Sequence, residues 1–70
     1  MKQRLPFVFH LPADDIRRRY LAADRPGERT RWHAVWLLAD AWPDRTPEQV
    51  ARLVGRSAVF VRNALKRWND

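Results

Sequence analysis

The sequence predicts an all-α fold. Apolar residues recur at intervals of three and four in four separate stretches, as they do on the buried face of a helix. The prolines fall between these stretches, where proline is tolerated, at Pro6, Pro12, Pro26, Pro43 and Pro47. They divide the 70 residues, enough for one small domain, into an extended arm and four candidate helices.

The arm is expected over residues 1–11 and the remaining domain over residues 12–70. Alternation of apolar side chains at 7–9 is compatible with a short strand or with an extended segment packed on the helices. The first helix should follow Pro12 and run to about Ala23. Its acidic residues come first and its arginine run follows, which is the order that the helix dipole favours.

The second helix is expected from about Glu28 to Ala41, after a loop at residues 24–28, and Pro43 should end it. Its apolar stripe comprises Trp32, Val35, Trp36, Ala39 and Trp42, widened by Leu38. These tryptophans, together with Trp68, are expected to pack in the core and to supply most of the stabilising burial.

The third helix has the strongest start signal in the chain. Thr46 is a candidate N-cap, Pro47 suits the first helical position, and Gln49 completes the pattern of a capping box. The expected apolar face of this helix consists of Val50, Leu53 and Val54.

Gly55 interrupts the basic amphipathic segment 50–65. Glycine ends a helix in the left-handed conformation without a Cβ penalty, and Ser57 can cap a new helix two residues later. The fourth helix should run from Ala58 to Trp68, with Val61, Ala64, Leu65 and Trp68 facing inward. Two short helices around a glycine-containing corner predict a helix-turn-helix over residues 46–68.

An ordinary helical hairpin in a small bundle is the alternative to this motif. The small Ala51 before Gly55 and the β-branched Val61 after it favour two helices that cross closely. The charge favours the motif as well, because 14 Lys and Arg oppose 8 Asp and Glu, which gives +6 and a pI of about 11.3. Such a balance indicates an anionic partner.

The sequence does not contain the residues that metal-binding, cofactor-binding or membrane-spanning proteins need. The chain has no cysteine, and neither His10 nor His33 has ligand spacing, so no cofactor or metal is expected. No apolar run is long enough to span a membrane, and the N-terminal residues do not resemble a signal peptide. The expected location is cytoplasmic and nucleoid-associated, with no membrane or small-molecule partner.

The stretches "RTRWHAVWLLADAW" and "TPEQVARLVGRSAVFVRNALKRWND" resemble the N-terminal DNA-binding region of mariner-like bacterial insertion-sequence transposases. The resemblance covers about residues 11–70 and implies a homeodomain-like three-helix core with one extra helix and a short apolar arm before it. It differs at residues 58–60, Ala-Val-Phe, which are often polar in that family. The family's catalytic domain, with its acidic metal-binding triad, is not in this sequence, so we expect no enzymatic activity.

With the fourth helix in a major groove, ten residues are the candidate contacts. Arg62 suits a guanine edge, Asn63 suits an adenine edge, and Ala58 and Val59 suit thymine methyl groups. Phosphate contacts are expected from Arg45, Thr46, Arg56, Ser57, Lys66 and Arg67. Weaker candidates are the arginine run at 17–19, and Lys2 and Arg4 as a minor-groove arm.

Double-stranded DNA is therefore the expected partner, read by a transposase-derived recognition module. One alternative is a small helix-turn-helix regulator that acts as a homodimer, for which the apolar arm offers the only obvious spare surface. A second alternative is a basic helical module that binds proteins or a membrane surface.

Overall fold

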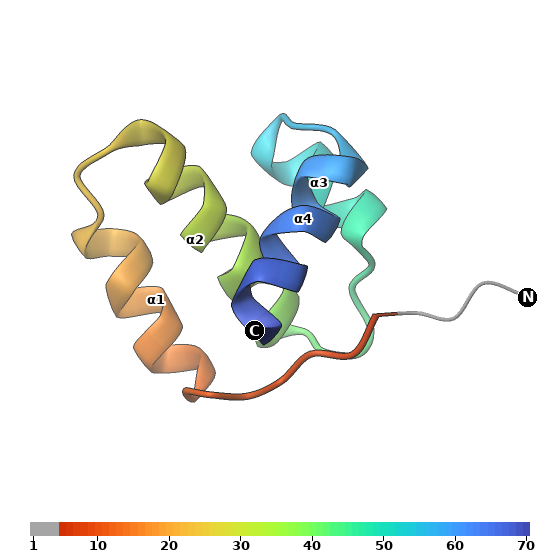
Figure 1. Ribbon diagram of the computed structural model, residues 1–70, viewed down its shortest axis with the longest axis horizontal. Coiled ribbons are helices and arrows are strands. Elements are labelled where there is room, and N and C mark those ends of the chain that lie inside the picture. The colour runs from red at the N-terminus through yellow and green to blue at the C-terminus, as the bar shows by residue number, and fades with distance from the viewer. Residues whose placement is uncertain (1–4) are drawn as a thin grey trace, which may run out of the picture.

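The computed structural model describes residues 5–70, and these form four helices with no strand. The helices are α1 (Ala13–Ala22), α2 (Pro26–Asp40), α3 (Pro47–Val54) and α4 (Ala58–Asn69) (Figure 1). This confirms the all-α fold, and the boundaries lie within two residues of those expected from the sequence.

Helix α2 lies at the centre of the arrangement. It packs against each of the other three helices, and α3 and α4 also pack against each other. Helix α1 contacts α2 alone among the helices and lies on the side away from α3 (Figure 1). Helices α2 to α4 therefore form a three-helix unit, and α1 is an added helix on its flank, as the sequence predicts.

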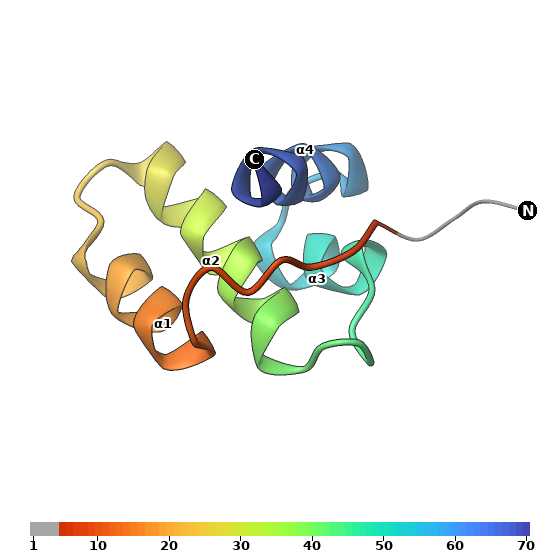
Figure 2. The same cartoon turned by 60° about the horizontal axis from the view of Figure 1, so that its bottom comes forward.

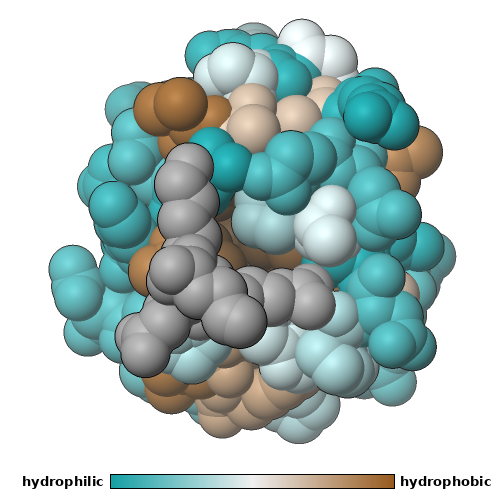
Figure 3. Space-filling view, turned by 90° about the vertical axis from the view of Figure 1, so that its right-hand side faces the viewer, coloured by the Kyte–Doolittle hydropathy of each residue, from teal (hydrophilic) through white to brown (hydrophobic). Residues whose placement is uncertain are grey.

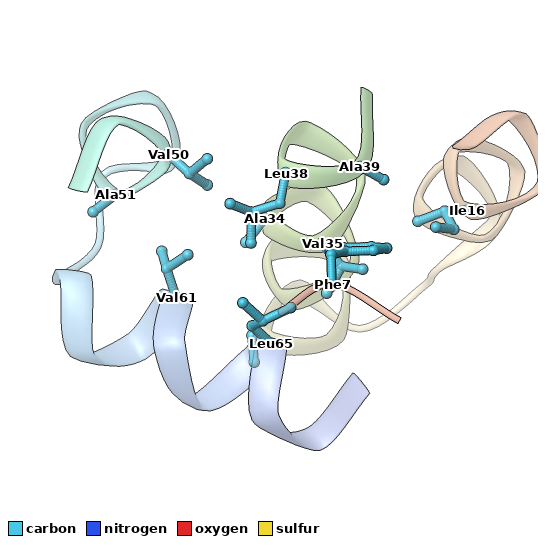
Figure 4. Packing of buried hydrophobic residues seen from close by; sticks show 11 residues of the cluster. Phe7, Ile16, Ala34, Val35, Leu38, Ala39, Val50, Ala51, Val61 and Leu65 are labelled. Carbon is cyan, nitrogen blue, oxygen red and sulfur yellow. The ribbon is translucent and has the colours of Figure 1, made fainter. Parts of the chain in front are cut away.

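Aliphatic side chains from all four helices make the centre of the core. Ile16, Leu38, Val50, Val61 and Leu65 are its largest fully buried members (Figure 4). Small residues on facing helices, Ala34, Ala39, Ala51 and Ala64, complete this set and let the backbones approach closely.

The tryptophans pack at the edges of the core. Trp32, Trp36, Trp42 and Trp68 lie against the buried cluster and are half-buried, and their share of the total burial stays a prediction. The indole rings are too large for the narrow spaces between alanine-rich faces. They therefore cover the edges of the core, where an indole N–H also finds a partner.

The apolar face of α3 also differs from the expected one. Val50 is fully buried and Val54 is half-buried, but the side chain of Leu53 is 60% exposed. Pro47 and Ala51 take the inward positions instead, at helical spacing with Val50. Seen from the side of the molecule where α3 lies, apolar residues appear as separate spots on a mostly hydrophilic surface (Figure 3).

Helix α2 begins at Pro26, two residues before the expected start at Glu28. Proline suits the first turn of a helix because its missing N–H would have no intrahelical partner there. Gly27 costs little so close to the helix end, so residues 26–28 are helical rather than part of the loop, and the extended Arg25 is the N-cap. After α2, the Trp42–Pro43 peptide bond of the connection to α3 is cis.

The described part of the arm, residues 5–11, crosses the helices as an extended segment and not as a strand (Figure 2). Phe7 enters the core at 7% exposure and lies near Val35 and Leu65 (Figure 4). Asn69 at the end of α4 holds the backbone: its Oδ1 accepts from the Val8 N–H at 3.0 Å and its Nδ2 donates to the Pro6 carbonyl at 2.8 Å. Residues 5–11 are thus part of the folded domain.

Candidate nucleic-acid interface

The corner between α3 and α4 has the predicted geometry. Gly55 has φ 72° and ψ 29°, the left-handed conformation, and its N–H donates to the Ala51 carbonyl at the end of α3. The Arg56 N–H also donates to that carbonyl, at 3.0 Å. Ser57 then caps α4, its hydroxyl accepting from the Phe60 N–H at 3.1 Å. Helix end, corner and restart are therefore each fixed by local hydrogen bonds.

The start of α3 is a complete capping box. The Thr46 hydroxyl accepts from the Gln49 N–H at 3.2 Å, and the Gln49 side chain accepts from the Thr46 N–H at 2.9 Å. The Thr46 hydroxyl accepts one bond in this cap, and its predicted contact with phosphate stays a prediction. Thr46 itself is half-buried, and the neighbouring Glu48 is exposed.

Helix α4 presents one exposed face opposite its buried face. Val59, Asn63 and Lys66 are exposed at helical spacing, and Val59 reaches 61%. Arg67 is exposed beside them, whereas Ala58 is half-buried. Four of the candidate contacts therefore lie on the accessible surface of one helix, namely Val59, Asn63, Lys66 and Arg67.

Arg62 does not point straight outward with these residues. Its guanidinium donates to the carboxylate of Glu48 in α3, so the two helices of the corner are joined by an ion pair. A hydrogen bond from its own backbone, followed by the charge of Arg62, holds the pKa of Glu48 below its usual value. Both side chains remain substantially exposed, at 41% and 51%.

Two further candidate arginines also have partners within the chain. The Arg45 guanidinium donates to the Leu37 carbonyl at 2.9 Å and is half-buried, so it ties the α2–α3 connection to α2. The Arg56 guanidinium lies 4.3 Å from the centroid of the Phe60 ring, a cation–π contact across the corner. Their expected role in phosphate binding stays a prediction.

The weaker candidates lie elsewhere. Arg18 pairs with Asp15 at 3.1 Å on α1, and Arg17 lies over the Trp36 ring. Lys2 and Arg4, the proposed minor-groove arm, fall outside the described residues. The Glu48 partner of Arg62 was missed because the two residues are fourteen positions apart and no sequence pattern pairs them.

The described residues were also compared with what a metal site and a membrane span require. Within residues 5–70, no three His, Asp or Glu side chains come together in a way that would hold a metal ion. Among the same residues, no helix has the length and apolar character needed to cross a membrane.

Two short helices joined by a capped corner, with a third helix packed against both, define the helix-turn-helix class. Residues 25–70, which contain α2, α3 and α4, match the family model of the homeodomain-like domain. The chain belongs to this homeodomain-like family. No match was found among curated proteins or among solved structures.

Proposed function

We propose that this protein binds double-stranded DNA in a sequence-directed manner, with α4 lying in the major groove. The observation that carries the proposal is the exposed face of α4, where Val59, Asn63 and Lys66 stand opposite the buried face at helical spacing. Membership of the homeodomain-like family supports it, as does the net charge of +6.

Each residue of this face has a distinct role. Asn63 has the paired donor and acceptor that suit an adenine edge, and Val59 suits a thymine methyl group. Lys66 and Arg67 carry positive charge along the helix and suit phosphates. Arg62 reaches a guanine edge only after it leaves Glu48, so the ion pair opposes its contact with DNA.

The DNA-recognition region of a transposase remains the role we propose, on the strength of the resemblance of "RWHAVWLLA" and the segment after it. In this role the chain recognises DNA and performs no chemistry. The dimeric regulator is the alternative, and the exposed side chains of Val8 and Phe9 on the arm favour it. Phe7 gives no such support because it is buried in the core. The mass in solution, with and without DNA, separates a monomer from a dimer.

The test begins with enrichment of binding sites from a pool of randomised duplexes, followed by titrations of the enriched duplex and of an unrelated one. About five neutralised phosphates should give a log–log salt slope of roughly −4 to −5. Asn63→Ala should weaken binding to the enriched duplex alone, by about 1–3 kcal/mol. Lys66→Ala should weaken both duplexes equally. Absence of duplex binding at low salt would overturn the proposal.

A further inference from the structure

A hollow of about 500 Å³ opens beside the C-terminal half of α4, between this helix, α1, α2 and the arm. We call it the α1–α4 hollow. Its lining is largely apolar, and Trp32 of α2 meets Trp68 of α4 edge to face with ring centroids 5.8 Å apart. The last turn of α4, which supplies Trp68, is the part of that helix nearest to α1 (Figures 1 and 2).

Three arginines from three different helices line this hollow. They are Arg19 of α1, Arg31 of α2 and Arg67 of α4, and the lining contains one acidic residue, Asp70. The ion pairs found within residues 5–70 are Arg18–Asp15 and Arg62–Glu48, so none of the three takes part in one. Three arginines against one acidic residue leave the lining with a net positive charge, and like charges gathered in this way raise the local potential, which an anion relieves.

Aromatic packing fixes one of these charges in place. The Arg19 guanidinium lies 5.7 Å from the centroid of the Trp32 ring. Such a contact restrains a long side chain before any ligand arrives, so less conformational entropy is lost on binding. Trp68, in turn, is held by its Nε1, which donates to the Val8 carbonyl at 2.7 Å.

The position of the hollow relative to α4 identifies its occupant. Arg67 directly follows Lys66 of the exposed α4 face, so the hollow continues that face toward α1 and α2. When a helix lies in the major groove, which is about 12 Å wide, a phosphate backbone runs along each of its flanks. The flank of α4 that carries Arg67 is the one that the hollow borders.

We propose that the α1–α4 hollow binds phosphates of the DNA strand on this flank, and that Arg19, Arg31 and Arg67 contact them. This inference rests on the proposed function and extends it. It gives α1, which lies outside the homeodomain-like match at residues 25–70, a direct part in DNA binding.

The test compares two variants that remove the same amount of charge. Arg19→Gln/Arg31→Gln removes one arginine of the hollow from α1 and one from α2. The control, Arg25→Gln/Arg29→Gln, removes two exposed arginines at the start of α2. Neither of them lines the hollow, and neither is among the predicted DNA contacts. Thermal unfolding of both variants confirms that they fold.

Duplex affinity is then measured over a series of salt concentrations. Each lost phosphate contact should reduce the magnitude of the log–log slope by about 0.9, so the hollow variant should lose about 1.8. Near 0.1 M salt this corresponds to roughly tenfold weaker binding for each lost contact, whereas the control should change the slope little. Equal slopes for the two variants would overturn the proposal, because the change in affinity would then come only from the lower net charge of the protein.

Two other outcomes separate the causes of failure. If the wild-type protein fails to bind any duplex, the proposed function and this inference fall together. If it binds duplex and the hollow variant binds equally well, the inference alone falls. A fluorescent poly-glutamate peptide identifies the competing occupant: peptide binding that only the hollow variant loses, with duplex binding intact, would assign the hollow to an acidic protein segment.

Discussion

The guanidinium of Arg62 in α4 is bound to the carboxylate of Glu48 in α3, across the corner of the helix-turn-helix. The residue that suits a guanine edge is therefore held by an acidic residue that DNA phosphates would repel. The ion pair therefore acts differently in the free protein and in the DNA complex. The pair joins the two helices in the free protein, and it must open or reorient when Arg62 reaches a base.

Glu48→Gln should therefore strengthen duplex binding. The substitution removes one negative charge beside the DNA and releases Arg62, and one additional phosphate-equivalent contact corresponds to roughly tenfold at about 0.1 M salt. The loss of an exposed ion pair should lower the free energy of unfolding by no more than about 1 kcal/mol. Anisotropy titration and urea unfolding measure the two effects.

The control for this change is Glu28→Gln, which removes an equally exposed acidic residue from the first turn of α2. It should alter duplex affinity by less than about twofold. If both variants bind DNA with the same affinity as the wild type, Arg62 does not lie at the interface.

Local signals in the sequence predicted the helices and their ends well. The capping box at Thr46, the left-handed Gly55 and the cap at Ser57 all form as expected, because each depends on residues within four positions of one another. Such hydrogen bonds are set by the sequence of a single turn.

The sequence allowed the arm to pack on the helices, but the individual residues that make the contacts between distant segments were not predicted. Asn69 and Phe7 fix the arm across sixty residues, and nothing local to either residue indicates this. The helical spacing of Leu53 predicted that this residue is buried. The packing of α3 against two other helices instead buries the adjacent face, which carries Pro47, Val50 and Ala51, and leaves Leu53 exposed. The hollow is another such product of tertiary structure, since Arg19, Arg31 and Arg67 meet only in the fold.

The two glycines should respond oppositely to substitution by alanine. Gly55→Ala forces a Cβ into the left-handed region, with φ at 72°, and should destabilise the domain by about 1–2 kcal/mol. Gly27→Ala lies in the first turn of α2 and should be neutral or stabilising by up to about 1 kcal/mol. A Cβ at either position meets no atom within 4 Å, so the difference is conformational. Thermal or urea unfolding measures it, and equal changes would contradict the role of Gly55 in the corner.

Asn69→Ala should release the arm from α4. It removes the two hydrogen bonds to Pro6 and Val8, and at about 0.5–1.5 kcal/mol for each bond the domain should lose roughly 1–3 kcal/mol. Amide hydrogen exchange at Val8 should accelerate by the corresponding factor. Asn63→Ala, on the exposed face of the same helix, is the control and should stay within about 0.5 kcal/mol of the wild type. Unchanged exchange at Val8 would mean that the packing of Phe7 and the hydrogen bond from Trp68 to the Val8 carbonyl are enough to hold the arm.

Stability should fall as the pH decreases through the range in which histidine titrates, and His33 should be one cause. Its ring stacks on Tyr20 at 4.4 Å between centroids, and burial, followed by the charge of Arg29, lowers its pKa from the ordinary value of 6.5. The unfolded chain therefore binds a proton at a higher pH than the native protein does. The contribution of His33 is fully present above pH 6.5 and is lost as the pH falls through the lowered native pKa.

Urea unfolding at about pH 7.5 and pH 5.5, on either side of the histidine range, measures this loss. His33→Phe keeps a flat ring against Tyr20 but cannot take up a proton, so its unfolding midpoint should fall less between the two pH values than that of the wild type. If His33→Phe loses as much stability as the wild type on acidification, His33 is not a cause, and the acid sensitivity arises from other groups.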